Sequence, residues 1–262
     1  MLLPRIIPCL LVRNKGLVKT VQFKDAKYVG DPINAVRIFN EKEVDELMLL
    51  DIDAACHGAE PDFKMIENLA AECRMPFCYG GGIKKAKQAQ RIIGLGVEKV
   101  AISSAAVDNP QLISQIVREA GSQSVVAVID VKKKLTGGNY EVRTHNGKKS
   151  AMKSPVEFAR QLESFGVGEI VVNSIDNDGM MKGYDLALVD QIRKSITVPM
   201  TVLGGAGSLT DIGKLIEKYG IIGAAAGSLF IFKGIYKAVL INYPNRIEKE
   251  ALIKEHYQIS RR

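Results

Sequence analysis

The sequence predicts a closed (β/α)8 barrel, the TIM barrel fold, on three observations. Short, β-branched apolar runs recur along the 262 residues, and stretches with helical character separate them. The runs are apolar almost throughout, which is typical of strands that are covered on both faces. Eight such strands alternating with helices predict a parallel sheet, and eight strands close a barrel in a chain of this length. We therefore expect a single barrel domain over residues 1–262.

The expected elements follow one another along the chain. Strands are predicted at residues 5–12, 46–53, 76–80, 99–104, 125–131, 169–176, 198–204 and 223–230. Helix starts are indicated by a capping residue before a proline, at Asp31-Pro32, Asn109-Pro110 and Ser154-Pro155, and by a capping-box pattern at residues 208–211. The longest connections, 13–30 and 132–150, follow the first and fifth strands and are expected to be loops that act as lids.

The two halves of the chain carry similar motifs at matching positions. Glycine-rich turns end the third and seventh strands at Gly80 and Gly204, which are 124 residues apart. Ser103-Ser104 follows the fourth strand and Gly227-Ser228 follows the eighth, with the same offset of 124 residues between the two pairs. The repeat predicts that the barrel is an internally duplicated half-barrel.

Composition narrows the class of protein. An apolar fraction of 47% and a charged fraction of 25% are ordinary for a soluble globule, and no stretch approaches the length of a membrane span. The net charge of +7 favours anionic partners, but the basic residues are dispersed and no nucleic-acid motif occurs. Four cysteines without zinc-ligand spacing and only three histidines predict no metal site. We expect a cytoplasmic protein without a cofactor and with reduced thiols.

Two sets of turns are candidates for binding phosphate. Glycine at a strand end lets backbone N–H groups approach an anion, and the turns after strands seven and eight are the usual phosphate site of this fold. The repeated set after strands three and four predicts a second phosphate site across the barrel mouth. The alternative is that these glycines only form tight turns. The candidate residues are Gly81, Gly82, Ser103, Ser104, Gly205, Gly207, Gly227 and Ser228.

Several carboxylates stand at the carboxyl ends of strands, where the active site of a barrel lies. Asp130 follows a wholly apolar run and is the strongest candidate for acid–base catalysis. Asp51 and Asp176 are further candidates, and Asp53 stands beside the first of them. Asp178 belongs to an Asp-Asn-Asp-Gly turn, where a capping or salt-bridging role is the better interpretation.

Four charged residues open strands at the opposite end of the barrel. They are Arg5, Glu46, Lys99 and Glu169. Two positive and two negative side chains could form a closed ring of ion pairs, which is costly to bury unless every member is paired. The alternative is four unrelated, solvated side chains.

Taken together, the motifs resemble the cyclase subunit of imidazole glycerol phosphate synthase over essentially the whole chain. They include Arg5-Ile-Ile-Pro-Cys9, Gly80-Gly-Gly-Ile83, Gly121-Ser-Gln-Ser-Val125 and Asp178-Gly179 before Gly183-Tyr-Asp185. The resemblance implies a barrel with pseudo-twofold symmetry, a bisphosphate ligand, and a glutaminase partner at the amino-terminal barrel face. It also implies that ammonia crosses the barrel through the four-residue charged ring. Lys19, Asn173 and Ser174 match pocket positions, although Asn173 replaces an expected hydroxyl residue.

One departure from the family pattern bears on function. The family uses two aspartates, at the ends of strands one and five, and Asp130 matches the second while Leu11 stands in place of the first. Ser103 also stands where the family tends to carry asparagine. Together with residues 6–11 and 14–19, this pattern resembles a paralogous branch of surface-polysaccharide synthesis. In that branch ammonia is passed to a separate amidotransferase that forms an acetamidino group on an N-acetylated sugar nucleotide.

Three functions therefore remain open. The first is an ammonia-conducting subunit for amidation of a sugar nucleotide. The second is an authentic cyclase of histidine biosynthesis, with Asp51 or Asp53 replacing the missing acid. The third is a non-catalytic scaffold that binds a phosphorylated ligand and stimulates the glutaminase.

Overall fold

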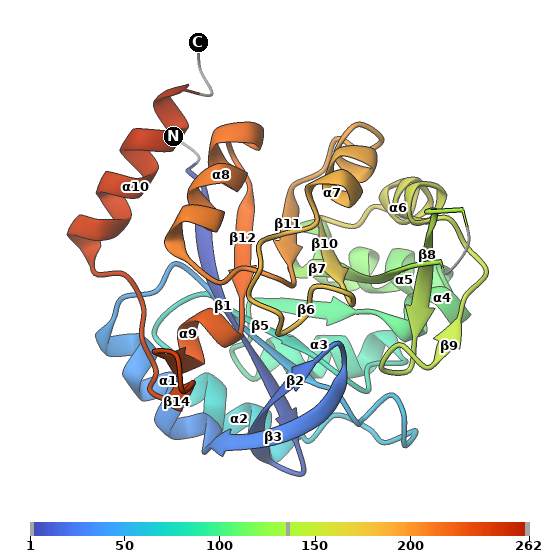
Figure 1. The fold of residues 1–262 in the computed structure, drawn as a ribbon. Coiled ribbons are helices and arrows are strands. Elements are labelled where there is room, and N and C mark those ends of the chain that lie inside the picture. The colour runs from blue at the N-terminus through green and yellow to red at the C-terminus, as the bar shows by residue number, and fades with distance from the viewer. Residues whose placement is uncertain (1–2, 135–136, 260–262) are drawn as a thin grey trace.

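The computed structural model describes residues 3–134 and 137–259, which form a closed barrel of parallel strands surrounded by helices (Figure 1). In order around the barrel, the strands are β1 (Arg5–Arg13), β4 (Leu47–Asp51), β5 (Phe77–Gly80), β6 (Lys99–Ile102), β7 (Val125–Lys133), β10 (Glu169–Ser174), β11 (Met200–Leu203) and β12 (Gly223–Ala226). Pairing of β12 with β1 and of β7 with β10 closes the ring, and every neighbouring pair is parallel. The predicted barrel is confirmed.

Each predicted run overlaps one barrel strand, but several strands are shorter than their runs. The last run was predicted over residues 223–230, whereas β12 ends at Ala226. Residues Ser228–Ile231 form the short helix α9 instead, because the backbone turns at Gly227. Apolar content alone cannot separate a strand from the buried helical turn that follows it.

Helices cover the outside of the barrel. They are α1 (Pro32–Glu41), α2 (Phe63–Glu72), α3 (Ala86–Gly94), α4 (Ser104–Asp108), α5 (Gln111–Ala120), α6 (Pro155–Ser164), α7 (Leu186–Arg193), α8 (Leu209–Tyr219) and α10 (Arg246–Ile259), with a 3-10 turn at Ser122–Ser124. The Asp31 side chain caps α1 through the Asn34 N–H, and α8 has the expected capping box. The expectation at Asn109 was wrong: this residue ends α4, and Pro110 is the residue that precedes α5.

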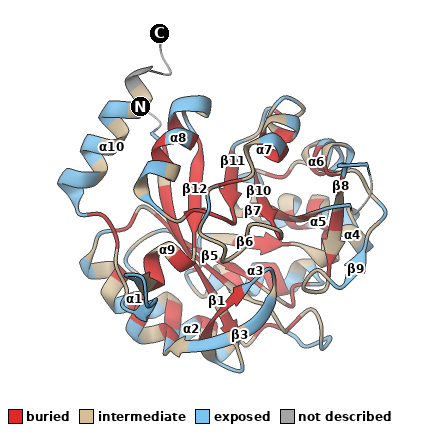
Figure 2. Ribbon diagram, in the orientation of Figure 1, coloured by how far each residue is buried: buried red, intermediate tan, exposed pale blue. Residues whose placement is uncertain are grey.

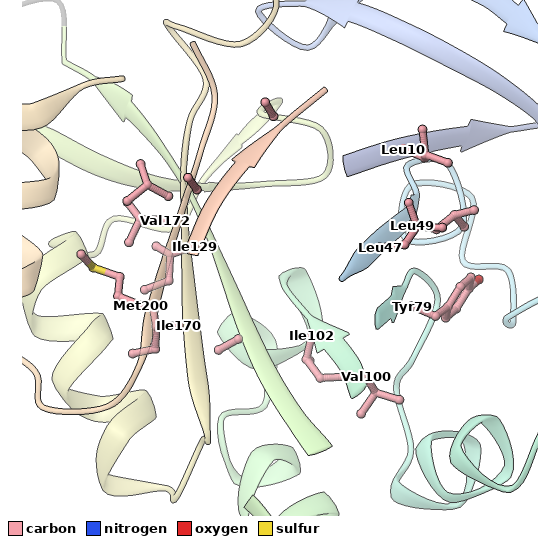
Figure 3. Close-up of a cluster of buried hydrophobic side chains, with 14 of the residues drawn as sticks. Leu10, Leu47, Leu49, Tyr79, Val100, Ile102, Ile129, Ile170, Val172 and Met200 are labelled. Atoms are coloured by element: carbon pink, nitrogen blue, oxygen red, sulfur yellow. The ribbon is translucent and has the colours of Figure 1, made fainter. Parts of the chain in front are cut away.

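Side chains alternate between two apolar layers because successive residues of a strand point to opposite faces. Outward-facing residues such as Leu10, Leu49 and Val172 pack against the helices (Figure 3). The other face fills the barrel axis with a separate cluster: Ile7, Cys9, Met48, Cys78, Ala101, Val126, Val128, Val171, Leu203 and Ala225. Burial on both faces explains the continuous apolar runs, and exposure is concentrated on the outer faces of the helices (Figure 2).

The two long connections are β-hairpins, so the prediction of plain loops was wrong. Strands β2 (Gly16–Val21) and β3 (Lys24–Gly30) continue β1 as an antiparallel hairpin, at the side of the molecule opposite α10 (Figure 1). Strands β8 (Tyr140–Thr144) and β9 (Lys149–Ser150) extend β7 in the same way. A further short hairpin, β13 (Phe232–Lys233) and β14 (Ala238–Val239), follows α9.

The excess of basic over acidic residues in this chain lies in the segments that form these two long hairpins. Residues 13–30 hold five basic and one acidic side chain, and residues 132–153 hold seven basic and one acidic. Their combined charge of +10 exceeds the +7 of the whole chain, so the remaining residues sum to −3. Positive charge is therefore concentrated on the hairpins that extend from the barrel strands.

Neither a membrane-spanning helix nor a metal-binding cluster occurs among the described residues. No helix within residues 3–134 and 137–259 is both long and apolar enough to cross a membrane. The same residues contain no group of three or more histidine, cysteine, aspartate or glutamate side chains that could hold a metal ion.

Candidate functional site

A cavity of about 370 Å³ lies at the carboxyl ends of the barrel strands. Most predicted site residues line it: Lys19, Asp51, Gly81, Gly82, Ser103, Ser104, Asp130, Asn173, Gly205, Gly227 and Ser228. Asp176, Ser174 and Gly207 do not. The two long hairpins contribute Phe23, His145 and Asn146 to its wall, so the cavity is bounded by the barrel below and by hairpin residues at its rim.

Asp130 is held on the inner face of β7 by two hydrogen bonds. The Ser103 hydroxyl donates to Oδ2 at 3.1 Å, and the Asn173 amide Nδ2 donates to Oδ1 at 2.9 Å. Burial raises the pKa of Asp130 to about 6, although both hydrogen bonds act to lower it. A carboxyl group with this pKa can accept and return a proton near neutral pH, as acid–base catalysis requires.

The raised pKa of Asp130 predicts a dependence of stability on pH. Since the folded protein binds this proton more tightly than the unfolded chain, stability is present at low pH and is lost as pH rises from about 4 through about 6. Asp130→Asn removes this loss and is expected to stabilise the protein at pH 7 by about 1–3 kcal/mol relative to wild type, with little difference at pH 4. Chemical denaturation of both proteins at the two pH values measures the effect.

The amide of this variant can be accommodated on β7. Asn173 Oδ1 has no hydrogen-bond partner among the described residues, so a small movement of the Asn173 amide would let this oxygen accept from the side-chain N–H that the substitution introduces. Equal stability differences at pH 4 and pH 7 would contradict a raised pKa for Asp130.

The other candidate carboxylates have different surroundings. Asp51 lines the cavity, but its Oδ1 accepts hydrogen bonds from the backbone N–H groups of Asp53 and Ala54, both at 3.1 Å. Burial raises the pKa of Asp51. Asp176 lies outside the cavity lining, where its Oδ2 accepts from the Lys133 backbone N–H at 2.8 Å. Asp51 therefore shapes the turn after β4, and Asp176 ties the end of β10 to the β7 extension.

Asp178 lines the cavity, although the sequence favoured a capping or salt-bridging role for it. Its Oδ2 accepts from the Thr20 hydroxyl at 2.8 Å and from the Phe23 backbone N–H at 3.2 Å. Burial raises the pKa of Asp178. The following Gly179, at φ 69°, packs its backbone against Thr20, so no side chain fits there. The Asp-Gly pair after a strand was the available signal, but its partner Thr20 is 158 residues away in the sequence.

Lys19 reaches from the first hairpin to the turn after β12. It is only 7% exposed, and its Nζ donates to the Cys9 carbonyl at 3.0 Å. The same Nζ lies against Gly227, where a Cβ atom would collide with it. Burial lowers the pKa of Lys19, while Asp178 acts to raise it. The ammonium group is thus placed at one of the two predicted phosphate sites.

The two glycine sets lie on opposite sides of the barrel mouth. Gly81 and Gly82 follow β5 with φ of 132° and 71°, and Gly204 and Gly205 follow β11 with φ of 92° and 114°. These left-handed conformations favour glycine, so tight turning accounts for part of the pattern. Gly207 differs, because its N–H donates to Asp211 Oδ2 at 2.9 Å as part of the α8 cap.

The predicted charged ring is closed. Arg5 contacts Glu46 and pairs with Glu169 Oε1 at 2.7 Å. Lys99 Nζ pairs with Glu46 Oε2 at 2.9 Å and with Glu169 Oε2 at 3.1 Å. Each cation therefore contacts both anions at the amino ends of the strands, and the Thr201 hydroxyl also donates to Glu169 at 2.5 Å. The alternative of four unrelated solvated residues is wrong, since Glu46 and Glu169 are 2% and 6% exposed.

Comparison with known proteins gives consistent matches. The family model described as "Histidine biosynthesis protein" matches residues 5–237. A protein of Vibrio vulnificus, provisionally named imidazole glycerol phosphate synthase subunit hisF3, is 57% identical over 97% of this chain and 98% of its own. A protein of Leptospira interrogans, provisionally named subunit HisF of the same synthase, is 58% identical over 96% and 99%. The imidazole glycerol phosphate synthase subunit HisF of Exiguobacterium sibiricum is 40% identical over 88% and 91%.

Proposed function

Because the chain belongs to the histidine biosynthesis protein family and is similar to HisF subunits of imidazole glycerol phosphate synthase, we propose that it conducts ammonia from a glutaminase to an acceptor other than the cyclase substrate. The glutaminase docks at the amino-terminal barrel face, beside the charged ring. Ammonia crosses the barrel axis and reaches the cavity at the mouth. A separate amidotransferase then uses it to form an acetamidino group on an N-acetylated sugar nucleotide.

The observation that carries this proposal is Leu11. It lines the cavity that Asp130 also lines, at the position where the family resemblance leads us to expect an aspartate. A leucine side chain has no proton to exchange, and loss of one acid–base group typically costs about 10²–10⁴-fold in rate. The machinery for ammonia is kept while the machinery for cyclisation is incomplete, which supports a changed acceptor.

Two further features support passage of ammonia along the axis. In the charged ring at the amino ends of the strands, each of the two cations contacts both glutamates. When one of these contacts opens to let a small neutral molecule pass, each charged side chain therefore keeps one partner of opposite charge. Above the ring, the apolar side chains that fill the axis include small ones, such as Ala101, Ala225 and Cys9. An apolar lining favours neutral ammonia over ammonium, because a charged ion pays a large desolvation cost there.

The proposal is tested by the cyclisation reaction itself. The purified subunit is given ammonium salt and the bisphosphate substrate phosphoribosyl-formimino aminoimidazole carboxamide ribotide, beside the Exiguobacterium subunit as the active reference. We expect turnover at least about 100-fold below the reference, and no rescue of a cyclase-deficient histidine auxotroph. Reference-level turnover with rescue would overturn the proposal and identify an authentic cyclase.

The authentic cyclase remains a second candidate because Asp130, with its pKa near 6, stands between two glycine turns suited to a bisphosphate. A scaffold that only stimulates the glutaminase is separated from the cyclase by Asp130→Asn. A scaffold keeps full pathway output in this variant as long as the complex with the glutaminase forms, whereas a cyclase loses it.

A further inference from the structure

The cavity is lined by several titratable side chains in addition to the Asp130 carboxylate. Besides Asp130, they are Cys9, Lys19, Asp51, Lys84, Asp108, His145 and Asp178. A reaction in which ammonia adds to carbon and another atom leaves needs one group to accept a proton and one to donate it. With Leu11 unable to do either, the second group must come from this set.

Most members of the set are committed to other contacts. Asp51 holds the turn after β4, Asp178 binds Thr20 and Phe23, and Lys19 donates to the Cys9 carbonyl. Burial raises the pKa of the Cys9 thiol to about 12. Of the two others, Asp108 is exposed at the end of the five-residue helix α4, and Lys84 is exposed just before α3.

His145 is different, because its ring is fixed and one ring nitrogen is unused. Ring Nδ1 lies 3.1 Å from the hydroxyl oxygen of the buried Thr144, and the backbone N–H of His145 donates to Ser104 Oγ at 3.2 Å. Gly147, at φ 72°, packs closely between Phe23 and Ile175. Among the described residues, nothing bonds to Nε2. Imidazole is the side chain best suited to exchanging protons at neutral pH.

The turn also places the histidine for contact with a ligand. His145 and Asn146 both have left-handed backbones, at φ 53° and 55°, and both line the cavity. Ser104, which anchors the turn, is one of the predicted phosphate-binding residues. A phosphorylated ligand seated at Ser104 would therefore lie beside the His145 backbone, in a cavity that His145 also lines.

We propose that His145 is the proton-donating partner of Asp130 in this cavity, where, in place of an aspartate at position 11, it supports only a slow reaction. Ammonia forms a C–N bond with an electrophilic carbon of a phosphorylated ligand, and the Asp130 carboxylate takes one of the nitrogen protons. Protonated His145 gives its Nε2 proton to the heteroatom whose bond to that carbon breaks. The proton on Asp130 returns to His145 through solvent, so charge and protons balance. The inference rests on the proposed function only in the delivery of ammonia to the cavity, and it adds a slow reaction in this cavity to the main transfer of ammonia to the separate amidotransferase.

The experiment measures the slow cyclisation by the wild-type subunit with ammonium salt and the bisphosphate substrate. His145→Gln is expected to lower kcat by about 100-fold with KM little changed, and to abolish the loss of activity on the alkaline side of the pH profile. His57→Gln is the matched control, because His57 is exposed on the turn after β4 at the same end of the barrel and does not line the cavity. It should leave kcat and the profile unchanged.

A second background separates proton donation from a structural role. In Leu11→Asp, the new carboxylate supplies the proton, so adding His145→Gln should lower kcat far less than it does in the Leu11 protein. A histidine that only holds the hairpin in place would cost the same in both backgrounds, and that result would overturn the proposal.

Nuclear magnetic resonance covers the case in which wild-type turnover is too slow to measure. The ring resonances of His145 are followed as the bisphosphate substrate is added, and contact with the ligand should shift them while those of His57 stay in place. His145 ring resonances that ignore the substrate would overturn the proposal. Reference-level cyclisation by wild type would refute the proposed acceptor but leave the His145→Gln comparison equally decisive.

Discussion

Leu11→Asp is expected to raise the cyclisation turnover of this subunit by about 10²–10⁴-fold. The half-buried Leu11 side chain already faces the cavity, so a carboxylate there would be presented to the same ligand as Asp130. The buried Lys19 ammonium reaches Cys9, two residues before Leu11 on β1, and would offset part of the cost of adding a negative charge. Turnover is measured with ammonium salt and the bisphosphate substrate.

Leu11→Asn is the matched control for this gain. Asparagine has the size and polarity of aspartate but no acidic proton, so turnover should stay at the wild-type level. If both variants fold and bind the substrate but show the same turnover, the absent carboxylate does not limit cyclisation, and Leu11 no longer supports a changed acceptor.

Glu46→Gln is expected to lower the free energy of unfolding by about 3–5 kcal/mol. Glu46 is one of two buried anions that contact both Arg5 and Lys99, and its loss leaves Glu169 to compensate both cations. Breaking one member of a buried ion-pair network costs more than the network contributes, because an uncompensated charge stays buried. Chemical denaturation gives the value.

Two comparisons make this expectation specific to the ring. Glu67→Gln breaks the exposed pair between Lys64 and Glu67 on α2 and should cost less than about 1 kcal/mol. The double variant Glu46→Gln/Lys99→Met removes one charge of each sign and should be more stable than Glu46→Gln alone. A single variant that is as stable as wild type would mean that the four charges are not coupled.

The barrel strands could be predicted from the sequence because burial on both faces leaves a continuous apolar run. The hairpins could not, since β3 is mostly exposed and its sequence, Lys-Asp-Ala-Lys-Tyr-Val-Gly, has no apolar run to mark it. Its strand conformation comes from antiparallel pairing with β2, which in turn pairs with the long first strand. Pairing between segments is a tertiary effect that local composition does not encode.

The candidate site shows the same division. Asp130 could be predicted as a site residue because it directly follows an apolar run that marks a barrel strand, and the active site of a barrel lies at the carboxyl ends of its strands. The sequence favoured Asp176 over Asp178, but of these two the structure places only Asp178 in the cavity lining. Beyond the end of a strand the alternation of side chains stops, and the direction of each residue depends on contacts such as those of Asp178 with Thr20 and Phe23. The charged ring was suggested by four strand openings, but only the closed barrel brings them together.

The uneven distribution of basic residues gives the molecule an electric asymmetry along the barrel axis. The two hairpin segments, 13–30 and 132–153, carry +10 while all other residues sum to −3. An anionic metabolite diffusing nearby is drawn toward the mouth before it touches any specific residue, and this long-range attraction weakens as salt screens it. The rate of ligand capture should therefore fall with ionic strength, while a neutral molecule such as ammonia feels no comparable pull.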